Sequence, residues 1–145
     1  MRIRHATDHE FDRAAARMDA GWLGAACGRL RRLVEDQSCR VLVAEEQGEL
    51  IAVLGLVLHP PGSGRSTTAT IRELRVHPDH HRRGIGSRLV RFAEGIARIN
   101  GCRKVEVLHD LVAWGDGRCW PGLGYEDPGA GLHKVFETCI QGSSG

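Results

Sequence analysis

The residues between His77 and Ser87 have the clearest chemical potential in this chain. They read His-Pro-Asp-His-His-Arg-Arg-Gly-Ile-Gly-Ser. Gly84 and Gly86 have no Cβ, so backbone N–H groups there can come close to a ligand. A helix that begins at this point directs its unpaired N–H groups and the positive end of its dipole at the same place, and the neighbouring arginines add guanidinium groups. The run predicts a pyrophosphate-binding site. The alternative is a solvated basic turn ahead of an ordinary helix.

Other anion and metal motifs fit the sequence less well. A Walker loop requires Gly-Lys followed by Ser or Thr, which residues 62–66 lack. A dinucleotide-binding fingerprint would require a third glycine where Leu89 stands. His77, His80 and His81 suggest a metal site, but no Cys or carboxylate spacing matches them, and we expect no metal.

The strand expected over residues 69–76, just before this run, has an irregular pattern. Its apolar residues change phase between Ile71 and Leu74. One extra residue, a β-bulge near Arg72 and Glu73, would produce this change, and so would a strand that is buried on both faces. Bulges often lie beside active sites, which makes the position a candidate for chemistry.

Two carboxylates are candidates for a general base. Glu73 lies in the suspected bulge, and Glu106 lies on the strand expected over residues 103–108. The alternative for each is a surface carboxylate paired with one of the many arginines. His109 could also titrate in a useful range, or be an ordinary loop histidine.

The remaining elements must position these groups. A capping box at Thr7 and Glu10 predicts a first helix, which Gly21 ends. A second helix is expected over residues 22–36, and Gln47-Gly48 is typical of a hairpin turn. Further strands are expected over residues 2–6, 41–46, 50–58 and 132–138, a long helix over 84–100 and a poor helix over 112–122. The apolar stripe of the long helix is expected to be Ile85, Leu89, Phe92, Ile96 and Ile99.

Length and composition limit the class of protein. The 145 residues suit a single domain, expected over residues 1–140, with a flexible tail at 141–145 of the kind that cloning leaves behind. A net charge of +2 gives no reason to expect a nucleic-acid or membrane partner, although all basic residues except Lys104 and Lys134 are arginines. The longest apolar run, residues 50–58, is far shorter than the roughly 20 residues that span a bilayer. The five cysteines are odd in number and lack disulfide-like spacing, and the chain starts without a signal peptide; we therefore expect a cytoplasmic protein.

The segment His81-Arg-Arg-Gly-Ile-Gly86 resembles the acyl-CoA signature of the GNAT N-acetyltransferases, [Gln/Arg]-x-x-Gly-x-[Gly/Ala] between a strand and a helix. Leu74-x-Val76-x-Pro78 precedes it, and Leu123-Gly-Tyr-Glu126 is similar to the family's Leu-Gly-Phe-Glu. The resemblance extends over residues 2–138. It implies an α/β (α+β mixed-sheet) fold, a central mixed β-sheet flanked by helices.

The resemblance also implies a co-substrate, acetyl-CoA. Backbone amides of the turn would bind its pyrophosphate, and the signature strand would pair with its pantetheine arm. The residues that would bind acetyl-CoA are Leu74, Arg75, Val76, His81, Arg82, Arg83, Gly84, Ile85, Gly86 and Ser87.

The resemblance departs from the family where the leaving thiolate is usually protonated. Trp120 stands at the position of the family's tyrosine, and an indole N–H is no acid at neutral pH. Tyr125, the one tyrosine in the chain, aligns with a packing aromatic instead. Trp120 is therefore expected to pack beside the sulfur, and Glu73, Glu106 and Trp120 are the catalytic candidates.

The activity implied is transfer of an acetyl group from acetyl-CoA to a primary amine of a small molecule or peptide, by a monomer or homodimer. The sequence does not identify the acceptor. The alternative is an acyl-CoA-binding module with little or no turnover, which Trp120 suggests.

Overall fold

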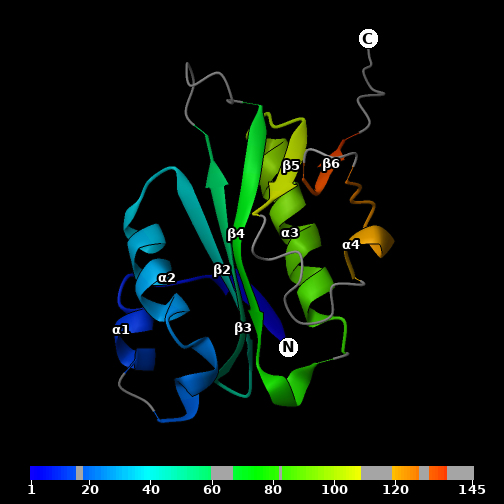
Figure 1. Ribbon diagram of the computed structural model, residues 1–145. Helices are drawn as coiled ribbons and strands as arrows, with labels where there is room; N and C mark the ends of the chain where they lie inside the picture. The colour runs from blue at the N-terminus through cyan, green and yellow to red at the C-terminus, as the bar shows by residue number, and fades with distance from the viewer. Residues whose placement is uncertain (16–17, 60–66, 82, 109–118, 128–130, 137–145) are drawn as a thin grey trace.

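A computed structural model describes residues 1–15, 18–59, 67–81, 83–108, 119–127 and 131–136. It contains a six-stranded sheet in the order β1-β2-β3-β4-β5-β6, in which β4 and β5 are parallel and all other neighbours are antiparallel (Figure 1). The strands are β1 (Arg2–His5), β2 (Cys39–Glu46), β3 (Glu49–Leu58), β4 (Thr68–Val76), β5 (Lys104–Val107) and β6 (His133–Val135). The helices are α1 (Glu10–Ala15), η1 (Met18–Leu23), α2 (Ala26–Glu35), η2 (Pro78–His80), α3 (Ile85–Ile99) and α4 (Cys119–Gly122).

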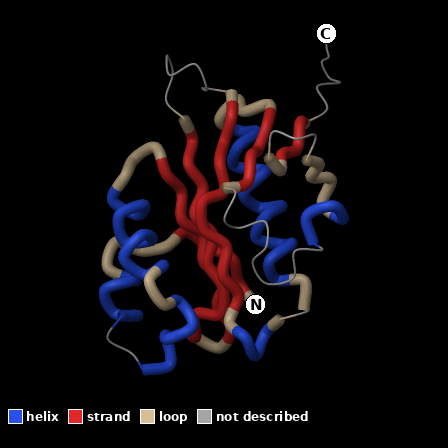
Figure 2. Tube along the Cα trace, in the orientation of Figure 1, coloured by secondary structure: helices blue, strands red, loops and turns tan. Residues whose placement is uncertain are grey.

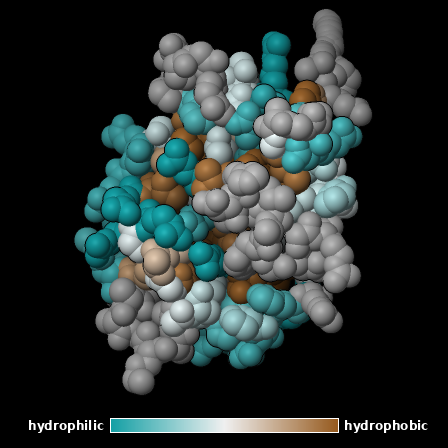
Figure 3. All heavy atoms as spheres, in the orientation of Figure 1, coloured by the Kyte–Doolittle hydropathy of each residue, from teal (hydrophilic) through white to brown (hydrophobic). Residues whose placement is uncertain are grey.

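The helices form a layer on each side of this sheet. Helices α1 and α2 pack together, and α2 contacts β2, whereas α3 lies on the opposite side and contacts β2, β3 and β4 (Figures 1 and 2). Two apolar clusters fill the two interfaces, one that includes Leu30 and Val43 and a larger one that includes Leu54 and Leu89. Hydrophilic residues cover much of the outer side of α2, at the left of Figure 3. The mixed sheet flanked by helices confirms the fold class that the sequence predicts.

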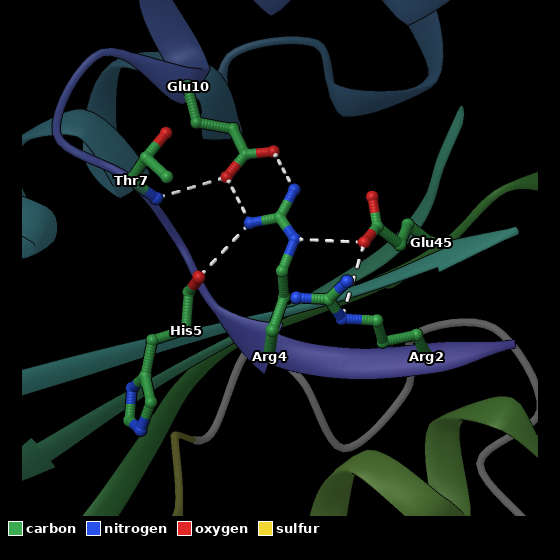
Figure 4. A network of polar contacts seen from close by, with 6 residues as sticks. All are labelled: Arg2, Arg4, His5, Thr7, Glu10 and Glu45. Carbon is green, nitrogen blue, oxygen red and sulfur yellow. Dashed lines mark hydrogen bonds and ion pairs between the residues drawn. The ribbon is translucent and has the colours of Figure 1, made fainter. Parts of the chain in front are cut away.

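The expected hairpin is present, and so is the backward bond of the expected capping box. Gln47 and Gly48 have φ values of 55° and 80°, the positive pair that a two-residue turn of type I′ requires. The backbone N–H of Thr7 donates to Glu10 Oε1 at 3.1 Å, which is the backward bond of the box. The same carboxylate accepts two bonds from Arg4, at 2.9 and 2.8 Å, and Arg4 also donates to Glu45 on β2 (Figure 4). These contacts fix the start of α1 to the first two strands.

Two helix predictions are wrong in part. The helix expected over residues 22–36 is divided into η1 and α2, because Gly24 has a φ of +54°, which an α-helix does not permit. In α3, Phe92 is 43% and Ile99 is 87% exposed, although both were expected on the buried stripe. The positions that face the sheet are Ile85, Leu89, Val90, Ala93, Glu94 and Ala97.

Candidate active site

The expected bulge is present in β4 and determines which way its side chains point. Gly55 of β3 lies opposite Glu73, but the next residue, Leu56, lies opposite Ile71, so Arg72 is the extra residue. Beyond the bulge, Leu74 joins the apolar cluster beneath α3. Because side chains alternate along a strand, Glu73 and Arg75 then face the α2 side of the sheet. The predicted bulge is confirmed, and its effect is to turn a carboxylate toward α2.

Glu73 is the most buried charged residue on that side of the sheet among the described residues, with 4% of its surface exposed. Its Oε1 accepts a hydrogen bond from Arg29 Nε on α2. Its Oε2 lies 4.0 Å from Arg75 Nε and accepts no hydrogen bond from any part of the chain that the structure describes. A buried carboxylate oxygen in this state has the capacity to accept a proton or a hydrogen bond from a ligand.

Gly55 allows α2 to come close enough for the contact between Arg29 and Glu73. A Cβ at Gly55 would lie 2.7 Å from Leu33 Cδ1 on α2 and 3.5 Å from Glu73 Cβ. The first distance is shorter than real Cβ contacts, so a side chain here would displace Leu33. The glycine therefore helps to position Arg29 over Glu73.

Strands β4 and β5 stay together for only part of the length of β4. Their parallel pairing covers Thr68–Ile71 and Lys104–Val107, and one further bond joins Leu108 N–H to the carbonyl of Ile71 at 2.9 Å. Strand β4 continues to Val76, and within the described ranges no strand pairs with residues 74–76 on the side away from β3. A strand edge of this kind can accept an extended ligand as an added strand, although the carbonyl of Val76 is already 2.9 Å from the His81 ring.

The first turn of α3 lies just beyond the end of β4. Gly84 has a φ of +74° and precedes the helix, and no side chain among the described residues caps it. A Cβ at Gly86 would meet only Val76 Cγ2, at 3.6 Å. The first N–H groups of this 15-residue helix have no intrahelical acceptor, so they and the helix dipole favour an anion here. The residues present therefore fit a pyrophosphate group.

Two basic side chains of the turn have partners within the protein. Arg83 donates to Glu46 Oε2 at 2.8 Å and lies 2.6 Å from His80 Nδ1. The hydrogen bond from Arg83 lowers the pKa of the Glu46 carboxyl below its ordinary value. The ring of His81 is 2.9 Å from the carbonyl of Val76. Arg82, the third basic residue predicted for the turn, lies outside the described residues.

Glu106 is the second predicted base. It lies opposite Thr70 in the parallel register, half-buried, and Lys104 Nζ is 3.3 Å from its Oε1. Its neighbours Val105 and Val107 are in the cluster beneath α3, so Glu106 points to the same side of the sheet as Glu73. The structure thus brings both candidates to one side, but only Glu73 is buried. His109 lies outside the described residues.

Trp120 and Tyr125 pack against each other, with their rings 5.2 Å apart and nearly perpendicular. Trp120 is 2% exposed. The Tyr125 hydroxyl donates to Glu94 Oε2 at 2.8 Å inside the protein, and burial together with the charge of Glu94 raises the pKa of Tyr125 far above its ordinary value. Lys134 on β6 lies 3.1 Å from Glu94 and completes the ion pair. The hydroxyl is therefore already used in a structural bond.

The group formed by Glu94, Tyr125 and Lys134 was missed by the sequence analysis. One signal was available: Glu94 stands between Val90, Ala93 and Ala97 at helical spacing, and a carboxylate on a buried stripe needs a partner. The identity of that partner depends on β6, which is far away in the sequence.

The described residues contain no group of three His, Cys, Asp or Glu side chains placed to hold a metal ion. None of their helices is both long enough and apolar enough to cross a bilayer.

The fold and the site together define a class of protein. A mixed sheet whose β4 is bulged and continues past its pairing with β5, followed after η2 by a helix without a side-chain cap, is consistent with an acyltransferase. Residues 4–115 match the model of the Acetyltransferase (GNAT) family, and the chain belongs to that family.

Individual relatives agree with this membership. The human protein named Probable N-acetyltransferase 14 is 36% identical over 88 residues, a match that spans 57% of this chain and 41% of that protein. An aminoglycoside 6'-acetyltransferase type Ii has the same fold, with a TM-score of 0.72, 17% identity and 93% and 97% of the two chains covered. The PaiA N-acetyltransferase of Thermoplasma acidophilum, solved in complex with coenzyme A, gives a TM-score of 0.64 with 18% identity and covers 94% and 100%.

Proposed function

We propose that the protein transfers an acetyl group from acetyl-CoA to a primary amine of a small molecule or peptide. The observation that carries the proposal is that three features follow one another along the chain: a buried carboxylate at the bulge of β4, an edge at 74–76 that no described strand pairs with, and a helix without a side-chain cap beyond the end of β4. Membership of the GNAT family supports the same activity.

In this proposal acetyl-CoA lies along β4, with its pyrophosphate at the start of α3. The backbone N–H groups from Gly84 to Ser87 bind the phosphate oxygens, because no Cβ at Gly86 stands in the way. The edge of residues 74–76 pairs with the pantetheine arm. Arg83 contributes mainly through its backbone, because Glu46 already holds its guanidinium group.

Glu73 is the proposed general base. The amine nitrogen attacks the acyl carbon, the carbon–sulfur bond breaks, and CoA leaves as a thiolate. The proton of the amine passes to Glu73, directly or through one water. The burial of Glu73 at the bulge, on the strand that binds the thioester, favours it over the half-buried Glu106.

No tyrosine protonates the thiolate in this mechanism. The Tyr125 hydroxyl donates to Glu94, and Trp120 is no acid at neutral pH. A thiol with a pKa near that of cysteine, about 8.5, can leave as the anion and take its proton from water. We assign Trp120 a packing role beside the sulfur.

A second function, acyl-CoA binding with little turnover, is favoured by one observation. The place of the usual thiolate acid is taken by Trp120, which is buried against Tyr125. Both functions predict the same binding of acetyl-CoA, so only turnover separates them.

A screen of primary amines with acetyl-CoA, with detection of the released CoA thiol, tests the proposal. We expect release with at least one amine, and no release from a folded Gly86→Glu variant. The matched control is Gly95→Ala on the same helix, where a Cβ meets nothing within 4 Å. Tight acetyl-CoA binding without thiol release from any amine would favour the binding module instead. A chain that binds no acetyl-CoA would contradict both functions.

A further inference from the structure

The outward face of α3 exposes two large apolar side chains that take no part in the apolar core. Phe92 is 43% and Ile99 is 87% exposed. They are seven residues apart in one helix, so they lie two turns apart on the same side of it. Gly95 stands between them, and a Cβ built there would meet nothing within 4 Å.

These residues form a hole in the helix surface. In helix packing, residues at i, i+3, i+4 and i+7 are the four corners of the hole that receives a side chain from a facing helix. Phe92, Gly95, Ile96 and Ile99 have this spacing. A glycine inside a helix makes the helix less stable than an alanine would, and within the described residues nothing packs on Gly95 that needs the space. The absence of a side chain there lets a partner come close.

The charge beside this hole is positive and unbalanced. Arg88, Arg91 and Arg98 are exposed, and no carboxylate of the described residues forms an ion pair with any of them. The one acid of the helix, Glu94, is buried and already paired. With three arginines and no acid, the exposed side chains of α3 sum to a charge of +3. Such a surface attracts an acidic partner.

From this arrangement we propose that the outward face of α3, made up of Arg88, Arg91, Phe92, Gly95 and Ile99, docks an acidic amphipathic helix of another protein. One apolar side chain of that helix enters the hole at Gly95. Its acidic side chains lie against Arg88 and Arg91. The inference does not rest on the proposed acetyltransferase function.

Two other occupants fit this face less well. If a second copy of the chain docked here through its own α3, arginines would meet arginines, and neither helix has an exposed acid to separate them. An anionic membrane would satisfy the arginines, but a flat lipid surface does not fill a hole between two projecting side chains. A helix satisfies both the charge and the shape.

The test uses a fluorescently labelled peptide of about three heptads, with leucine at positions a and d and glutamate at e and g, so that its own charges oppose self-association. Fluorescence anisotropy measures its affinity for the wild-type protein. The control peptide has lysine in place of glutamate. We expect the acidic peptide to bind, and the basic peptide to bind at least about tenfold more weakly.

Gly95→Leu is the diagnostic variant, because it fills the hole while it adds apolar surface and removes a glycine from the helix. We expect the acidic peptide to bind this variant at least about tenfold more weakly than the wild-type protein. The matched control is Gly28→Leu on α2, where a Cβ also meets nothing within 4 Å, and we expect its affinity for the peptide to be unchanged. Arg91→Glu is expected to weaken binding of the acidic peptide by about tenfold. Both α3 variants are expected to keep wild-type affinity for acetyl-CoA.

Several results would overturn the inference. One is an acidic peptide that does not bind the wild-type protein at concentrations up to about 1 mM. Another is equal or tighter binding of that peptide to Gly95→Leu, as a flat apolar patch would give. Binding to phosphatidylcholine–phosphatidylserine vesicles that Gly95→Leu strengthens would assign the face to a membrane. Dimerisation in sedimentation experiments that Phe92→Ser abolishes would assign it to a second copy. Loss of acetyl-CoA binding by the wild-type protein would contradict the proposed function alone.

Discussion

Replacing Tyr125 by phenylalanine removes one buried hydroxyl and keeps the ring that packs on Trp120. The hydroxyl donates to Glu94 Oε2 at 2.8 Å, and Lys134 Nζ lies 3.1 and 3.3 Å from the two oxygens of the same carboxylate. The variant therefore leaves Glu94 buried but still paired with a cation. This separates a structural role of the hydroxyl from a catalytic one.

The expected loss of stability follows from these contacts. A buried hydrogen bond to a charged group contributes about 1.5 to 3 kcal/mol. Because Lys134 continues to satisfy Glu94, we expect Tyr125→Phe to cost the lower end of that range, about 1.5 to 2 kcal/mol. Lys134→Met removes the charge partner of a carboxylate that is only 7% exposed, so it is expected to cost more.

Urea denaturation measures the free energy of unfolding, and CoA thiol release measures the rate. We expect Tyr125→Phe to retain at least about a third of the wild-type kcat, because its hydroxyl has no part in the proposed chemistry. A loss of a hundredfold or more in a folded variant would show that Tyr125 protonates the thiolate. The assignment of Tyr125 as a packing aromatic would then be wrong.

Three further predictions follow from other contacts. Glu73→Gln is expected to lower kcat by about 10²- to 10⁴-fold, as removal of a general base does, whereas Glu106→Gln should change kcat by less than about tenfold; equal losses in steady-state assays would contradict the choice of base. NMR titration should place the pKa of the Glu46 carboxyl below its ordinary value, and Arg83→Gln should restore the ordinary pKa, because the hydrogen bond from Arg83 stabilises the charged carboxylate. The stabilisation of the fold by this pair is complete above about pH 4.3 and is lost as the pH falls through the lowered pKa. Gly55→Ala should destabilise the fold by about 1 to 3 kcal/mol in denaturation experiments, since its Cβ displaces a leucine of α2; an unchanged unfolding midpoint would refute this packing.

The bulge illustrates how much of the site could be predicted from the sequence. A change of apolar phase between Ile71 and Leu74 is a local signal, because only an extra residue, or burial of both faces, produces it. The structure contains the extra residue, Arg72. Other local signals, the Gln47-Gly48 pair and the glycine at position 84, likewise predicted the hairpin turn and the start of α3.

Contacts between distant segments could not be predicted in this way. The buried stripe of α3 was misplaced because Phe92 and Ile99 are more hydrophobic than alanine and dominate the apolar pattern. In the structure Ala93 and Ala97 are buried instead, because their small side chains allow the helix to pack closely against the sheet. The partners of Glu73 depend on how α2 lies across β3, which Gly55 determines through close approach rather than through any pattern. The buried face of α3 and the partners of Glu73 therefore depend on packing between distant segments and not on the periodicity of the sequence.

Calorimetric titration of acetyl-CoA is the most direct test of the site at β4 and α3. Wild-type protein and Gly95→Ala are expected to bind one acetyl-CoA per chain with the same affinity. Gly86→Glu is expected to bind none while it remains folded by circular dichroism, because its side chain adds bulk and negative charge beside the N–H groups of the first turn. Unchanged acetyl-CoA affinity in folded Gly86→Glu would contradict the site.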